Sequence, residues 1–166
     1  PTLLPATMPA MEGPADVAAS SAQCQVAAAD LIGAWVEAGT PEIDAFEFVD
    51  ASGQNCESTY EEVRPLFIES NLWYSGSRSC VACHGTDVVT ASAQLDLSNL
   101  AGIKAGSRRA DAESNGTDIL GAGKWTSSLL YDFISTSKAD VPGHSDISSN
   151  LLIFAGTLLP EATPTP

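Results

Sequence analysis

Basic residues are scarce in this chain of 166 residues, which has 7 Lys and Arg against 21 Asp and Glu. Phosphate groups would repel the formal charge of −14 at pH 7, which excludes binding to nucleic acid or to an anionic membrane surface. Long apolar runs are also missing. The longest spans residues 151–159, short of the roughly 20 residues of a transmembrane helix. With 44% hydrophobic residues, the chain is still too apolar for a disordered acidic tail, and we expect a globular protein.

An initiator Met and a hydrophobic signal region are absent as well, so we expect Pro1 to begin a processed or trimmed chain. The length favours one domain, with or without an extension. Histidine and methionine are rare, with two residues of each, which limits the side chains that can bind a metal ion.

The four cysteines carry the most specific signal. Cys80, Cys83 and His84 form a CxxCH motif, the attachment sequence of c-type haem. Each thiol can form a thioether with one haem vinyl group, and the adjacent histidine is the proximal ligand of the iron. A zinc site would need a second pair of ligands, and a thioredoxin-like CxxC would need a βαβ context. The motif therefore predicts one covalently bound haem c.

The other two cysteines, Cys24 and Cys56, form an even pair. Haem c is attached outside the cytoplasm, in compartments that also favour disulfides. We expect a Cys24–Cys56 disulfide that closes a loop of about 30 residues and stabilises the fold by about 3–4 kcal/mol. Two buried free thiols or a redox-active pair are the alternatives. The expected location is extracytoplasmic: periplasm, cell surface or extracellular space.

The apolar periodicity predicts four or five short helices and essentially no sheet, so the expected fold class is all-α. We expect an extended Pro/Ala-rich arm over residues 1–22 and a Pro/Thr-rich tail over residues 160–166. Between them, a helix and loop closed by the disulfide occupy residues 23–57, and a helical haem domain occupies residues 58–159. The predicted segments are a helix over 23–38, a loop over 40–57, a helix from 58 that bends or starts at Pro65, a helix over 125–134 and a last helix over 151–159.

Several short motifs resemble the planctomycete-type cytochrome c domain, a class I-like monohaem cytochrome. They are VRPLF (63–67), CVACHG (80–85), LDL (95–97), SSLLY (127–131) and VPG (141–143). The resemblance covers roughly residues 58–159 and implies a small helical domain around one haem. In that family the position of Val141 usually holds a methionine that is the sixth iron ligand. Valine cannot bind iron, so the resemblance points to another ligand here.

Three side chains are candidates for the sixth ligand: His144, Met8 and Met11. His144 lies 60 positions after His84, in a Pro-Gly loop between two predicted helices. The methionines lie in the predicted arm, which would have to fold back. We expect His84 and His144 to be the axial ligands, giving low-spin iron of relatively low potential, because a second imidazole lowers the potential relative to a thioether. An open or water-bound position is the remaining alternative.

The haem would need apolar walls and cationic partners for its propionates. Candidates for the walls are Phe67, Trp73, Tyr74, Leu97, Leu100, Trp125, Leu129 and Phe133. Candidates for the propionates are Lys104, Arg108, Arg109 and Lys124, with solvated loop charges as the alternative. Asn115 begins an Asn-Gly-Thr glycosylation pattern, and the tail is a second candidate for glycosylation; the sequence decides neither.

The function favoured by these patterns is electron transfer by one haem c, without catalysis. The expected partners are other redox proteins or copies of the chain itself, as a subunit of an oligomer, filament or larger complex. The alternatives are a haem enzyme or gas sensor with an open sixth position, and a mainly structural envelope subunit. An open position predicts ready binding of CO by the reduced protein.

Overall fold

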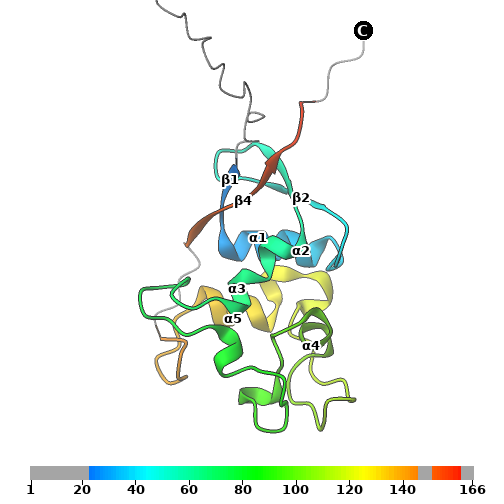
Figure 1. Ribbon diagram of the computed structural model, residues 1–166, viewed down its shortest axis with the longest axis vertical. Coiled ribbons are helices and arrows are strands. Elements are labelled where there is room, and N and C mark those ends of the chain that lie inside the picture. The colour runs from blue at the N-terminus through cyan, green and yellow to red at the C-terminus, as the bar shows by residue number, and fades with distance from the viewer. Residues whose placement is uncertain (1–22, 146–150, 162–166) are drawn as a thin grey trace, which may run out of the picture.

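The computed structural model describes residues 23–145 and 151–161. A sheet lies at one end of the molecule, and short helices and loops form the rest (Figure 1). The strands are β1 (Gln23–Ala27), β2 (Phe46–Val49), β3 (Asn55–Ser58) and β4 (Leu152–Leu158). The α-helices are α1 (Ala28–Glu37), α2 (Tyr60–Val63), α3 (Pro65–Ile68), α4 (Leu100–Ala105) and α5 (Leu129–Ser135). The short 3-10 helices are η1 (Cys80–Ala82), η2 (Ser92–Gln94), η3 (Gly121–Gly123) and η4 (Trp125–Ser127). The fold is thus mixed α and β, and the all-α prediction was wrong.

The sheet is antiparallel, with strand order β1-β4-β3-β2. Its first strand occupies the start of the segment predicted as a helix over residues 23–38. Cys24 and Val26 are buried while Gln23 and Gln25 are exposed, the alternation of a half-buried strand. The helix α1 begins only at Ala28. The predicted arm over residues 1–22, with Met8 and Met11, lies outside the described residues, as do residues 146–150 and 162–166.

The segment predicted as a loop over residues 40–57 contains a hairpin of β2 and β3. Phe46 and Phe48, two positions apart, both point into the core. The connecting turn is held by the carboxylate of Asp50, which accepts hydrogen bonds from the backbone N–H groups of Ser52 and Gln54, both at 2.9 Å. An aspartate that accepts hydrogen bonds from its own turn can be recognised from the local sequence. The pairing of β3 with β4 joins distant parts of the chain and cannot be recognised in this way.

The last strand, β4, replaces the helix predicted over residues 151–159. A continuous apolar run fits either a buried strand or a buried helix. Two features favour the strand. Gly156 has a φ of +70°, which a right-handed helix does not contain. The two strands β1 and β3 also lie on either side of β4 and supply its hydrogen-bond partners.

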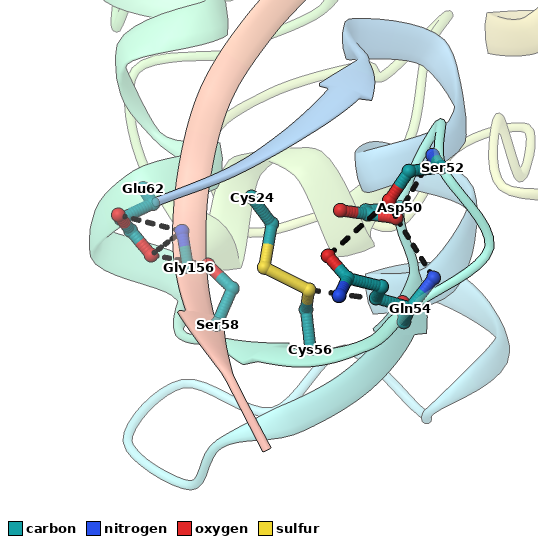
Figure 2. The surroundings of a disulfide bond; sticks show 8 residues. All are labelled: Cys24, Asp50, Ser52, Gln54, Cys56, Ser58, Glu62 and Gly156. Atoms are coloured by element: carbon teal, nitrogen blue, oxygen red, sulfur yellow. Dashed lines mark hydrogen bonds between the residues drawn. A yellow bond between two sulfur atoms is a disulfide. The ribbon is translucent and has the colours of Figure 1, made fainter. Parts of the chain in front are cut away.

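The predicted disulfide is confirmed: Cys24 of β1 is bonded to Cys56 of β3 (Figure 2). These strands are not neighbours, because β4 lies between them. Two strand spacings in a flat sheet come to about 9.6 Å, yet the two Cα atoms are 6.6 Å apart. The sheet therefore folds around β4 at this point. A carboxylate oxygen of Asp50 lies within 4.8 Å of both sulfur atoms, but the sulfurs are bonded to each other and do not form a metal site.

The helices pack beneath the sheet around one continuous core. Its most deeply buried large side chains are Trp35, Phe67, Leu31, Ile32, Leu66 and Ile103. The predicted break at Pro65 is present, since α2 ends at Val63 and α3 starts with the proline, where its missing N–H costs no helical bond. Near the end of the helical part, Ser128 caps α5 by accepting a hydrogen bond from the N–H of Tyr131 at 3.0 Å.

Within residues 23–145 and 151–161, no helix has the length and apolar character needed to cross a bilayer.

Candidate functional site

The CxxCH motif begins at η1, which follows a loop after α3. The 3-10 turn is closed by the N–H of Cys83, which donates to the carbonyl of Cys80 at 3.2 Å. Cys80 is half-buried, with its Sγ 3.7 Å from the carbonyl oxygen of Leu66, whereas Cys83 is exposed. Both are free thiols, and burial raises the pKa of Cys80 to about 11. Neither sulfur is in a disulfide, and the exposed Cys83 thiol is the more accessible of the two.

The third residue of the motif, His84, is fixed by the segment that follows it. Its Nδ1 lies 2.8 Å from the carbonyl oxygen of Ser92, and its own carbonyl accepts the N–H of Leu97 at 2.9 Å. A ring nitrogen that donates to a backbone carbonyl sets the tautomer and leaves Nε2 as the ligand atom. This is the arrangement expected of a metal-binding histidine.

His144 is presented by a tight turn after α5. Pro142 and Gly143 occupy its two central positions, Gly143 has a φ of +80°, and the N–H of His144 donates to the carbonyl of Val141 at 3.0 Å. These are the features of a type II turn, which needs a positive φ at its third position. The Pro-Gly pair seen in the sequence is thus the local cause of the position of His144.

The turn brings His144 next to His84. The centres of the two imidazole rings are 6.3 Å apart, with 60° between their planes, although the residues are 60 positions apart in the chain. An imidazole nitrogen binds a metal ion at about 2 Å, and it lies about 1.1 Å from the centre of its own ring, given bond lengths like that of a peptide C–N. Two imidazoles that bind one metal ion from opposite sides therefore have ring centres about 6 Å apart. The observed spacing fits a shared metal.

Both histidines are held in the neutral form that binds metals. Burial lowers the pKa of His84, and the neighbouring His144 lowers it further, against the opposing effect of the Ser92 carbonyl. Burial also lowers the pKa of His144; the backbone of Phe133 opposes this, and the positive charge of Lys138 adds to it. The lone pairs of both rings are therefore free of protons at neutral pH.

The two rings differ in how they are oriented. The Nδ1 of His144 is buried and has no hydrogen-bond partner among the described residues. Instead, the ring of His144 packs against the ring of Phe133 in a T-shaped arrangement, with ring centres 5.2 Å apart and planes at 83°. The orientation of His144 thus depends on packing and on its loop.

The predicted apolar walls are only partly at this site. Phe133 contacts His144, and Trp73 donates its Nε1–H to the same Leu66 carbonyl that contacts Cys80. Trp125 lies elsewhere, against Tyr131 and over Gly33 of α1. Leu129 is 40% exposed.

One predicted propionate partner has another role. The guanidinium of Arg109 is buried and donates to the carbonyls of Ala112 and Ser114, so it holds its own loop. Lys104, Arg108 and Lys124 are exposed, as is Asn115 of the glycosylation pattern.

Two hollows on the surface of the described residues are lined by neither histidine. One, of about 560 Å³, lies between α1, β2 and Trp125; the other, of about 220 Å³, lies between Val88, α4 and Arg109. The sequence analysis did not identify two residues near the histidines. Ser92 orients His84 through its backbone carbonyl, and Lys138 bonds the loop that carries His144. A backbone carbonyl leaves no signal in a side-chain pattern.

Comparison of the chain with models of protein families, with curated proteins and with solved structures gave no match.

Proposed function

We propose that this protein carries one haem c, attached through Cys80 and Cys83, and transfers electrons. The observation that supports it best is the 6.3 Å spacing of the His84 and His144 rings next to two free thiols. Neither histidine lies near the other in sequence, so their approach is independent of the CxxCH pattern. The residues present fit the cofactor by ligand type and by ring spacing.

Each residue has a distinct part in this proposal. The two thiols would anchor the haem, His84 would be one iron ligand with its ring fixed by the Ser92 carbonyl, and His144 would be the second iron ligand. Haem c, when bound, supplies a one-electron Fe(III)/Fe(II) couple. The neutral imidazoles favour a low potential relative to a His/Met pair.

Electron transfer is favoured over catalysis because both axial positions have a candidate protein ligand. Iron held by two side chains offers no coordination position to a substrate. An open sixth position would instead suit a haem enzyme or a gas sensor. The distance of 6.3 Å between the ring centres of His84 and His144 favours the closed arrangement.

We place the protein outside the cytoplasm, since haem attachment of this kind and the Cys24–Cys56 bond both belong to oxidising compartments. Its partner is another redox protein or a second copy of the chain. The formal charge of −14 favours a basic partner over an acidic one, because complementary charge steers association.

The test is a set of visible spectra of protein produced together with a haem-attachment system. Oxidised, reduced and CO-treated samples are compared for the wild type, His144→Ala and Val141→Ala. The last variant is the control, since it shortens a side chain of the same turn that cannot bind iron. We expect covalent haem, low-spin spectra and little CO binding for the wild type and the control, and CO binding for His144→Ala.

Two results would contradict the proposal. Protein without covalent haem, or with haem still attached after Cys80→Ser and Cys83→Ser are combined, would rule out the attachment site. Rapid CO binding by the wild type would favour the gas sensor or enzyme, and an unchanged low-spin spectrum of His144→Ala would remove this histidine as a ligand.

A further inference from the structure

Lys138 contacts both the loop that carries His144 and the Phe133 ring that packs against it. Its backbone N–H donates to the carbonyl of His144 at 2.8 Å, and its own carbonyl accepts the N–H of Val141 at 3.0 Å. These two bonds close the loop at both ends of the Val141–His144 turn. The loop follows α5 and is drawn in orange in Figure 1.

The side chain of Lys138 ties this loop back to α5. Its Nζ is 2.8 Å from a carboxylate oxygen of Asp132, and it lies 5.0 Å from the ring centre of Phe133. The same Phe133 ring contacts His144. Asp132 and Phe133 are neighbours on one helix, so a single lysine fixes both the backbone of the loop and the aromatic ring that orients His144.

This anchor matters because it supports the turn and the Phe133 ring that position His144. His84 is oriented by a hydrogen bond to Ser92, whereas the buried Nδ1 of His144 is unpaired among the described residues. Residues in a loop move more readily than those in packed elements. Without the Lys138 anchor, the loop can carry the ring away from the position opposite His84.

We propose that Lys138, bound to Asp132, is a positioning residue that keeps His144 at the sixth coordination position of the iron. This inference rests on the proposed haem function. It predicts that the Lys138–Asp132 pair controls how often the iron is open to an external ligand, while attachment through Cys80, Cys83 and His84 is unaffected.

The experiment measures the rate of CO binding to the reduced haem-loaded protein in five forms: wild type, Lys138→Met, Asp132→Asn, Lys138→Arg and Arg64→Met. Methionine keeps the apolar stem of lysine without its charge. Arg64 is an exposed basic residue between α2 and α3 with no part in the proposed site, and Arg64→Met is the control. Thermal unfolding of each form reports any general loss of stability.

We expect Lys138→Met and Asp132→Asn to bind CO about five- to tenfold faster than the wild type, from the combined loss of an ion pair and a cation–aromatic contact. Lys138→Arg keeps the charge and should behave like the wild type, as should Arg64→Met. Because the pair is partly exposed, high salt should shift the wild type toward the Lys138→Met rate.

The outcomes separate the two proposals. If the wild type has no haem, or binds CO as fast as His144→Ala, the haem function itself fails. If His144→Ala opens the site but Lys138→Met and Asp132→Asn both match the wild type, only the positioning role fails. The positioning role would also be overturned if the CO rate of every variant, Arg64→Met included, rose in proportion to the fall in its unfolding temperature.

Discussion

Gly156 is the residue on which the packing of β4 against β3 depends most directly. A Cβ atom added to it would lie 2.4 Å from the carbonyl oxygen of Glu57 and 2.8 Å from the ring of Phe48. Its N–H points at the carboxylate of Glu62, with distances of 3.0 and 2.9 Å to the two oxygens (Figure 2). With a φ of +70°, this position combines a conformation that favours glycine with a close approach of two strands.

We predict that Gly156→Ala lowers the free energy of unfolding by about 2–5 kcal/mol, the sum of a left-handed backbone and of overpacking. The matched control is Gly53→Ala, in the turn between β2 and β3. Gly53 has a φ of +89° but no atom within 4 Å of an added Cβ, so only about 1–2 kcal/mol should be lost. Urea unfolding measures both; equal losses would show that the approach of β4 to Glu57 is unimportant.

At the scale of elements, the strand β4 is the part of the molecule that most differs from expectation. Ala155 is 2% exposed and Phe154 is 68% exposed, so adjacent residues point to opposite sides as a strand requires. In the predicted helix the buried face would have been set by spacings of three and four residues instead. A strand and a helix over this segment therefore predict different tolerance to a charge at Phe154 and at Ala155.

A pair of substitutions tests the strand. Ala155→Asp places a charge in the core and should cost about 3 kcal/mol or more, because a buried unpaired charge is strongly unfavourable. Phe154→Asp changes an exposed side chain and should cost less than about 1 kcal/mol. Far-UV circular dichroism and urea unfolding follow the two variants. Greater damage from Phe154→Asp than from Ala155→Asp would contradict the position of β4.

At the scale of the whole molecule, the sheet joins the two ends of the described chain. β4 follows the segment that carries His144, and it lies between β1 and β3, which precede the CxxCH motif. The disulfide crosses this arrangement by linking the strands on either side of β4. The candidate site with Cys80, Cys83, His84 and His144 contains neither of the bonded cysteines, so the disulfide and the proposed haem attachment use separate pairs of cysteines.

We predict that combining Cys24→Ser and Cys56→Ser lowers the free energy of unfolding by about 3–4 kcal/mol, since the bonded residues are 32 positions apart and the unfolded chain regains the entropy of that loop. The haem spectrum of the folded variant should equal that of the wild type. Urea unfolding of oxidised wild type and variant, with reduced wild type as the control, measures the effect. A stability unchanged by both treatments would contradict it.

Much of the candidate site was predictable because it is local. The spacing of Cys80, Cys83 and His84 is contained in five residues, and the Pro142-Gly143 pair specifies the turn before His144 by its own backbone preferences. The Cys24–Cys56 pairing followed from an even count of cysteines, two of which already had a role. The CxxCH motif and the Pro-Gly turn are each specified by a few consecutive residues. The disulfide could be predicted because the chain has only four cysteines.

The sheet and the meeting of the two histidines were decided only by the tertiary structure. The elements are short, with strands of four to seven residues and most helices no longer than seven, so local propensity is weak in each. Residues 152–158 are a strand because β1 and β3 supply their hydrogen-bond partners from far along the chain. The approach of His84 and His144 to 6.3 Å likewise needs α5, the Lys138 contacts and the Ser92 carbonyl together, and no short window of sequence contains all of them.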